Sequence, residues 1–200
     1  QLQRMSSGEL RDLIKNGEAI TGLRVEQAAA TGIIQVANGF PYFACLLICY
    51  AGLKALDARR SNVTLDDVFG AIRDAIEQFG GRLSQQSKNQ IALFDECGNL
   101  ESLGRLAGAA QAAGGRFEFE EVQALFPDKE IVGQSKSFIE DLANKKIILL
   151  SDDGSEFGIL RFKDETAVPY IWFLWAYKHL RETASSKFNF ALDNRADSAW

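Results

Sequence analysis

The chain has 200 residues, of which 46% are hydrophobic and 24% are charged, as is typical of a globular protein with one large or two small domains. Its formal net charge is -5: residues 1–87 carry nine basic and nine acidic side chains, and residues 88–200 carry thirteen and eighteen. Because nucleic-acid surfaces need clustered Lys and Arg, this balance disfavours a broad nucleic-acid-binding surface.

Two helices are predicted at the N-terminal end. Ser6 and Glu9 have the spacing of a capping box, in which each side chain satisfies a free backbone N–H of the other residue. This first helix is predicted to end at Asn16-Gly17, where Gly17 can take the left-handed cap conformation. The second helix is predicted to run from Arg24 to Ala37 and to stop at Asn38-Gly39.

Two further helices complete a predicted four-helix unit. Pro41 is suited to the first position of the third helix, because its missing N–H costs nothing there. The apolar residues of this helix cover most of its circumference and predict a central position: Phe43, Leu46, Leu47, Ile48, Cys49, Tyr50 and Leu53. Thr64 is a good N-cap for the fourth helix, and Asp66 and Asp67 oppose its dipole. Gly80-Gly81 closes the unit.

The same region raises the questions of a metal site and of a membrane span. Cys45 and Cys49 lie four residues apart on one predicted helix face, either as half a metal site or as two small buried hydrophobic residues. We favour the second interpretation, because no further ligand lies nearby. The uncharged stretch from Gln27 to Leu53 is broken at Gln35, Asn38, Gly39 and Pro41, so no spanning helix is expected. Reduced thiols fit the cytoplasm, which is the expected location.

The second half of the chain has the element order of a winged helix: helices and then a β-hairpin. Its predicted elements are helices at Gln90–Cys97 and Leu100–Ala113, an extended piece at Arg116–Phe119, helices at Glu120–Leu125 and Ser135–Asn144, strands at Lys146–Leu150 and Phe157–Phe162, and a helix at Ala167–Arg181. Asp153-Gly154 is a strong hairpin signal between the two strands. The aromatic cluster of the last helix is expected either in a core or on a partner surface: Tyr170, Trp172, Phe173, Trp175 and Tyr177.

One ordered pattern runs through the first eighty residues. It reads Met5-Ser6-x-x-Glu9-Leu10-x-x-Leu13-Ile14, then Ile33-Ile34-x-x-Ala37-x-Gly39-x-Pro41-x-x-Ala44, then Val63-Thr64-x-x-Asp67-Val68-x-x-Ala71-Ile72. The pattern resembles the helical lid of AAA+ ATPases, in the branch of archaeal-type ATPases, origin-recognition-like initiators and STAND switch proteins. The resemblance implies a mainly α chain, with a four-helix lid-like bundle (1–82), a winged-helix domain with a small hairpin (83–183) and a C-terminal tail (184–200).

In relatives of this family with a Gly-x-Pro motif, the proline lies near the adenine ring of a bound nucleotide. The resemblance therefore implies that Gly39, Phe40 and Pro41 contact ATP or ADP, whereas the alternative interpretation is an ordinary helix break. Positions 38–44 hold no arginine, which puts a γ-phosphate-sensing role in doubt. The phosphate-binding pattern Gly-x-x-x-x-Gly-Lys-Ser/Thr is absent, so we expect the nucleotide only with a core upstream of Gln1.

The chain itself is therefore expected to be non-catalytic, with no catalytic or metal-binding residue. Its single histidine, His179, has Lys178 and Arg181 beside it at a predicted helix end and no positioned nucleophile. Its expected role is regulatory: it would couple the nucleotide state of the absent core to a partner of the winged helix. A DNA-binding module and an adaptor without any nucleotide link are the two alternatives.

The predicted recognition helix and wing give the candidate contacts with a partner or with DNA. These candidates are Gln134, Ser135, Lys136, Lys145 and Lys146. Acids lie among them and in the predicted wing: Glu140, Asp141, Asp152, Asp153 and Glu156. Because acids repel a phosphate backbone, a protein partner is favoured over DNA.

Overall fold

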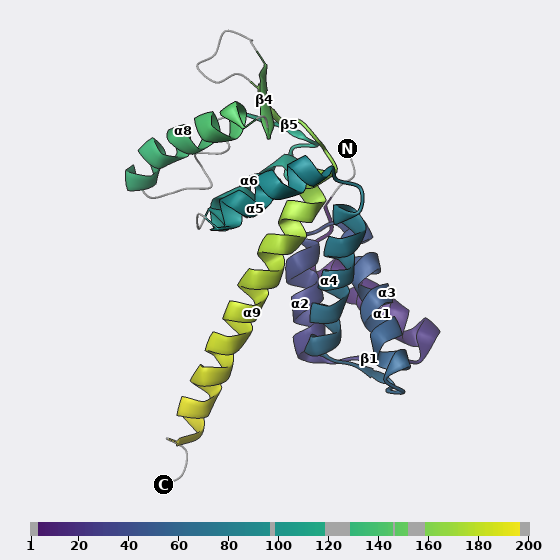
Figure 1. Cartoon of the computed structure of the whole chain (residues 1–200). Helices are drawn as coiled ribbons and strands as arrows, with labels where there is room; N and C mark the ends of the chain where they lie inside the picture. The colour runs from purple at the N-terminus through teal and green to yellow at the C-terminus, as the bar shows by residue number, and fades with distance from the viewer. Residues whose placement is uncertain (1–3, 97–98, 119–128, 146, 152–158, 197–200) are drawn as a thin grey trace. The chain divides into compact units, whose positions relative to one another are not determined.

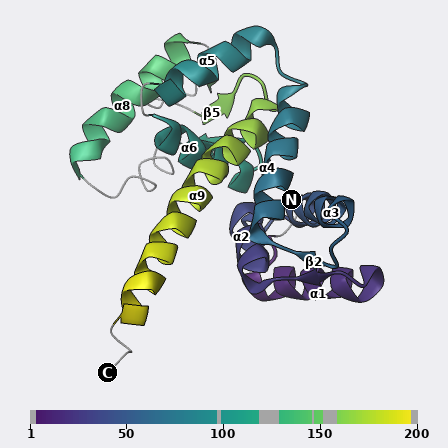
Figure 2. The ribbon, with the colours of Figure 1, turned by 60° about the horizontal axis from the view of Figure 1, so that its bottom comes forward.

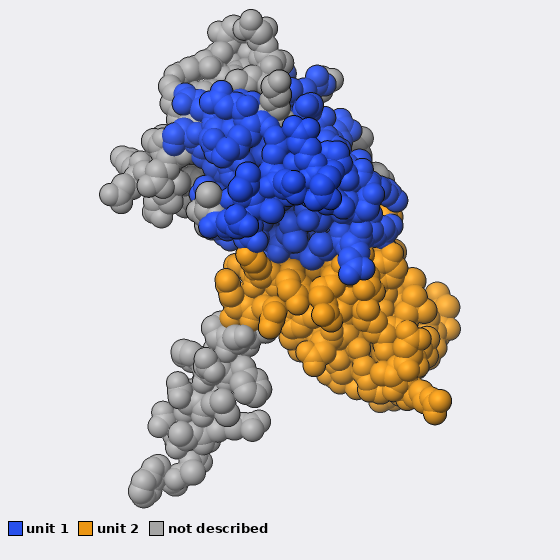
Figure 3. Space-filling model, in the orientation of Figure 1, with its two compact units in different colours: residues 1, 76–175 blue, residues 2–75, 176–200 orange. Residues whose placement is uncertain are grey.

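The computed structural model describes residues 4–96, 99–118, 129–145, 147–151 and 159–196. The chain divides into two compact units (Figure 3): a helical unit of residues 2–75 and 176–200, and a mixed unit of residues 1 and 76–175. The prediction of a mainly α chain is confirmed. The predicted sequence domains stay predictions, because compact units and sequence domains are different divisions of the chain.

The helical unit is a bundle of short helices with one two-residue strand pair (Figures 1 and 2). Its elements are α1 (Ser7–Thr21), β1 (Arg24–Val25), α2 (Gln27–Ala37), α3 (Pro41–Asp57), β2 (Asn62–Val63), the part of α4 (Leu65–Gly80) up to residue 75, and the part of α9 (Ala167–Ala196) from residue 176. The four predicted helices are therefore present, with changed ends.

The first two helices differ from the prediction at their ends. α1 continues through Asn16-Gly17 and ends at Gly22, whose φ of 72° is left-handed and whose N–H bonds to the Glu18 carbonyl at 2.9 Å. Gly17 instead lies inside the helix, where a Cβ would meet Ile48 at 3.8 Å. Arg24 and Val25 are not helical, because they pair in parallel with Asn62 and Val63.

Helix α3 is apolar nearly all round, but only one of its faces is covered within the helical unit. Its buried residues are mainly small: Phe43, Ala44, Leu47, Ala51, Gly52 and Ala55. Small side chains let the neighbouring helices approach on that face, which leaves Cys45, Cys49 and Leu53 exposed. The prediction of two buried cysteines is therefore wrong, whereas α3 does lie against α1, α2 and β2.

The segment of α9 in the helical unit packs on α2 and α4. A Cβ built on Gly32 would lie 3.4 Å from Leu180, and the rings of Phe69 and Tyr177 meet edge to face at 5.9 Å. α9 runs on to Ala196, beyond the predicted end at Arg181 and through most of the predicted tail. Exposed His179 consequently lies inside a helix and not at a helix end.

The mixed unit combines helices with a three-stranded antiparallel sheet of order β3-β5-β4. Besides the ends of α4 and α9, its elements are α5 (Gln85–Glu96), α6 (Leu100–Ala112), β3 (Arg116–Glu118), α8 (Lys129–Asn144), β4 (Ile148–Ser151) and β5 (Ile159–Phe162). Ile148 pairs with Phe162 in the predicted hairpin, and Arg116 pairs with Arg161 on the other edge of β5. The predicted helix Glu120–Leu125 and the Asp153-Gly154 turn lie outside the described residues.

Two helices of the mixed unit begin earlier than predicted. α5 starts at Gln85, because the Ser84 hydroxyl accepts the N–H of Ser87 at 3.1 Å and caps the helix. α8 starts at Lys129 and includes Gly133.

Close packing of α6 against α9 accounts for much of the aromatic cluster. Gly104 and Gly108 leave room for Trp175 and Trp172, because a Cβ on either glycine would overlap the facing indole. Trp175 donates its indole N–H to Glu101. Trp172 and Phe173 are buried, so this part of the cluster belongs to a core.

Candidate functional site

The turn between α2 and α3 has an uncommon backbone in which two consecutive residues are left-handed. Asn38 has a φ of 48° and Gly39 a φ of 81°, and the N–H of Asn38 bonds to Ile34 at 3.2 Å as the cap of α2. Phe40 then returns to extended backbone, and Pro41 opens α3. We call Gly39, Phe40 and Pro41 the corner.

The N-terminal segment crosses this corner at close range. The Met5 N–H bonds to the Gly39 carbonyl at 2.8 Å. A Cβ on Gly39 would lie 3.0 Å from the Met5 carbonyl oxygen and 3.1 Å from Cβ of Arg4. The Arg4 guanidinium lies over the Phe40 ring, 4.9 Å from its centroid, in a cation–π contact. The described chain thus begins beside the corner.

A hollow of about 390 Å³ opens beside Gly39, lined by Arg4, Asn38 and the first residues of α1. The start of α1 is held by the predicted capping box, with Ser6 N–H bonded to Glu9 at 2.7 Å and Glu9 N–H bonded to Ser6 at 3.3 Å. The Ser6 N–H and the Ser6 hydroxyl, 2.8 Å from Oε2, both donate to the Glu9 carboxylate and lower the pKa of the Glu9 carboxyl. The Glu9 carboxylate already occupies this helix start, so the Arg4 guanidinium is the group at the hollow that favours an added anion.

The corner residues remain accessible. Gly39, Phe40 and Pro41 are half-buried, and Tyr42, the next residue, is 57% exposed. The Phe40 ring also meets Phe43 at 5.6 Å, which holds its position. The corner therefore offers an apolar face beside a polar hollow within the helical unit, the combination that an aromatic base with an attached phosphate would need. A nucleotide contact at these three residues stays a prediction.

The predicted partner contacts are spread along and beyond α8. Gln134, Ser135 and Lys136 lie inside the helix and not at its start, and their side chains lie outside the described part of the chain, as does Lys146. Lys145 follows the helix: its Nζ lies 2.7 Å from Asp141 Oδ2 and 4.4 Å from the Phe94 ring centroid. This lysine is engaged within the mixed unit. The acids of the predicted wing lie outside the described residues.

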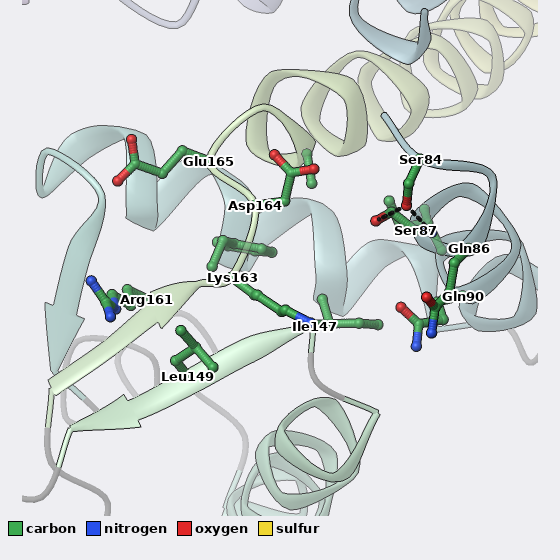
Figure 4. Close-up of a pocket in the computed structure, with 13 residues that line it drawn as sticks. Ser84, Gln86, Ser87, Gln90, Ile147, Leu149, Arg161, Lys163, Asp164 and Glu165 are labelled. Atoms are coloured by element: carbon green, nitrogen blue, oxygen red, sulfur yellow. Dashed lines mark hydrogen bonds between the residues drawn. The ribbon is translucent and has the colours of Figure 1, made fainter. Parts of the chain in front are cut away.

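Sequence reasoning missed a cavity of about 640 Å³ in the mixed unit (Figure 4). The start of α5 lines one side with Ser84 and Ser87, whose hydroxyls lie 2.9 Å apart. Arg161 and Lys163, at the end of β5, lie across from them. Arg161 and Lys163 are two residues apart in the sequence, so a strand would place both side chains on one face. The sequence gives no further signal of the cavity, because the elements that enclose it pair non-locally.

Neither a metal centre nor a membrane span was found in the described ranges. There, no group of three or more His, Cys, Asp or Glu side chains is placed to hold a metal ion. Every helix in the same part of the chain is too short or too polar to cross a bilayer.

No protein-family model and no curated protein matches the chain. Solved structures give low-level similarity only. The RuvB Holliday junction branch migration motor of Thermotoga maritima is 16% identical, with a TM-score of 0.38, over 90% of this chain and 50% of that one. The ORC2 protein of Aeropyrum pernix, in ADPNP–ADP complexes, is 12% identical, with a TM-score of 0.33, over 92% and 48%. The chain thus spans about half the length of these proteins, and similarity at this level carries no argument about function.

Proposed function

We propose that the chain is the non-catalytic C-terminal region of an AAA+-type ATPase, in which the corner contacts an adenine nucleotide held by an upstream core. The observation that carries the proposal is the crossing of Arg4 and Met5 over Gly39. Because of this crossing, a domain that precedes the chain would lie close to Gly39, Phe40 and Pro41, the residues that the family resemblance assigns to the nucleotide. A change in the nucleotide would then alter the corner and move the helical unit as a lid.

The mixed unit would present a winged helix to a protein partner. Support comes from the antiparallel order β3-β5-β4, in which the strand before α8 pairs with the second strand of the hairpin. The Asp141 carboxylate beside Lys145 adds negative charge next to one predicted phosphate contact, which favours a protein over DNA. The STAND-like switch and the cytoplasmic location belong to the same proposal.

Two measurements test the nucleotide link. The residues encoded before Gln1 should contain a phosphate-binding loop, and isothermal titration of the 200-residue chain with ATP should show weak or no binding, because most contacts would belong to the core. Tight binding by the isolated chain, or an upstream sequence without such a loop, would contradict the proposal. The second result would favour an adaptor with no nucleotide link.

A chain extended to include the core allows a sharper test. Phe40→Ala should weaken ATP binding about tenfold, as expected when a buried aromatic contact to the base is lost. The matched control is Tyr42→Ala, because this exposed ring lies outside the corner. Equal losses in both variants would argue against a specific role for the corner.

The DNA alternative is tested on the chain as it stands. A mobility-shift assay between low and physiological salt should show weak binding with a flat salt dependence, since few phosphates would be neutralised. Tight, strongly salt-dependent binding that Lys136→Ala and Lys145→Ala reduce would favour DNA instead.

A further inference from the structure

Helix α3 carries an exposed apolar stripe for which the described chain provides no cover. The stripe consists of Tyr42, Cys45, Cys49, Leu53 and Leu56, all of them exposed. Their spacings of three, four, four and three residues place them within one narrow arc of the helix. Large exposed apolar patches on a globular unit usually mark an interaction surface.

The positions of the stripe residues are spaced symmetrically about Cys49. Tyr42 and Leu56 each lie seven residues from Cys49, and Cys45 and Leu53 each lie four. A helix with such a stripe is complementary to an antiparallel copy of itself, because each residue meets its counterpart about a two-fold axis. Tyr42 would face Leu56 of the second copy, Cys45 would face Leu53, and Cys49 would face Cys49.

Charge favours the same pairing. Pro41 and Asp57, the two ends of α3, each lie eight residues from Cys49, so the antiparallel register brings Asp57 of one copy to the start of α3 in the other. That start has no side-chain hydrogen bond at its N-cap, Phe40. An exposed carboxylate at the positive end of a helix dipole is favourable.

The surface beside the stripe is shaped to receive a second helix. A groove of about 440 Å³ runs between α1 and α3, and Cys45, Cys49, Leu53 and Leu56 form its α3 side. Ile20 of α1, 85% exposed, also lines it. Glu18 is the only charged lining residue, and it accepts the Val25 N–H at 2.6 Å.

We propose that this chain forms a two-fold symmetric dimer through antiparallel pairing of α3, with Cys49 next to its counterpart on the axis. The occupant of the groove is thus a second copy of this chain. The dimer would place Asp57 of the second copy near Phe40 and Pro41 of the corner, but the proposal does not depend on a nucleotide there and can be measured without one.

Sedimentation equilibrium of the whole chain under reducing conditions gives the first test. The wild type should show a monomer–dimer equilibrium with a dissociation constant below about 0.1 mM. Leu53→Asp should raise the dissociation constant about a hundredfold, because two unpaired carboxylates would be buried per dimer. Leu93→Asp is the matched control, since Leu93 is 50% exposed on α5, and it should change the constant less than about twofold. A chain that stays monomeric at about 1 mM, or equal effects of both variants, would overturn the proposal.

Cross-linking tests the register. With Cys49 as the only cysteine (Cys45→Ser, Cys97→Ser), mild oxidation should give a covalent dimer, because the two thiols meet on the axis. With Cys45 as the only cysteine (Cys49→Ser, Cys97→Ser), the thiol should face Leu53 and cross-link at least about tenfold more slowly. Equal rates, or faster reaction at Cys45, would exclude this antiparallel pairing.

Discussion

The Arg60 guanidinium donates two hydrogen bonds to the Asp67 carboxylate: Nη1 lies 2.9 Å from Oδ2, and Nη2 lies 2.7 Å from Oδ1. The same Oδ2 accepts the backbone N–H and the hydroxyl of Thr64, both at 2.8 Å. Arg60 Nη1 also reaches the Asn62 carbonyl at 2.9 Å. One nearly buried carboxylate thus fixes the start of α4 and the loop that carries β2.

Replacing this carboxylate should destabilise the helical unit. Asp67→Asn keeps the shape of the side chain but weakens its bonds to Arg60 and Thr64, so we expect a loss of about 2 kcal/mol in the free energy of unfolding. Urea denaturation measures the loss, and Asp66→Asn is the control, because Asp66 is exposed in the same first turn. A loss no greater than that of the control would show that the network contributes little.

The contribution of Asp67 should depend on pH. The hydrogen bonds from Arg60 lower the pKa of the Asp67 carboxyl below its ordinary value, so the carboxylate stabilises the fold above the unfolded pKa of about 3.9. This stabilisation disappears as the pH falls through the lower folded pKa. The stability difference between wild type and Asp67→Asn should therefore be constant from about pH 7 to 5 and shrink below about pH 4. A difference that persists unchanged in acid would refute this reasoning.

Gly39 should be more sensitive to substitution than another left-handed glycine of the same unit. Gly39→Ala and Gly22→Ala both force a residue with a Cβ into positive φ, which costs about 1–2 kcal/mol. Only at Gly39 does the new Cβ also press on Arg4 and Met5, because nothing lies within 4 Å of the corresponding position at Gly22. We expect Gly39→Ala to cost about 1 kcal/mol more in thermal or urea unfolding. Equal losses of unfolding free energy in the two variants would mean that Arg4 and Met5 can move away from the new Cβ at no energetic cost.

The contact of α6 with α9 should be intolerant of a single methyl group. Gly104→Ala would drive its Cβ into the Trp175 indole, and we expect a destabilisation of about 3 kcal/mol together with a change in tryptophan fluorescence. Gly8→Ala is the control: its Cβ would meet only the Ser6 hydroxyl, at 3.8 Å, so it should be neutral or stabilising by up to about 1 kcal/mol. An unchanged emission spectrum for Gly104→Ala would show that the indole does not pack there.

Local features of this fold could be predicted from the sequence, whereas features set by tertiary packing could not. The Ser6–Glu9 capping box, the Thr64 cap and the proline start of α3 depend on neighbouring residues, and the structure contains all three. The salt bridge from Arg60 to Asp67 requires a loop conformation that no periodicity reveals.

The missed features have the same physical origin. Arg24 and Val25 were predicted to be helical but form a strand, because they pair with Asn62 and Val63 far along the chain. The exposed face of α3 could not be separated from its buried face, because apolar residues lie on both faces and the small residues, Ala44, Ala51 and Ala55, select which one is covered. The corner was found from its Gly and Pro chemistry, but the crossing of Arg4 and Met5 over it is non-local.

The helical unit is assembled from two stretches of chain that the ribosome would make at different times. Its first stretch ends at residue 75, and the residues that cover Gly32 and Phe69, namely Leu180 and Tyr177, follow more than a hundred residues after the covered positions. During synthesis from the N-terminus, the face of α2 and α4 around Gly32 and Phe69 therefore stays uncovered until α9 has been made. A nascent chain halted before residue 176 would present that face to chaperones, whereas release of the full-length chain would close it.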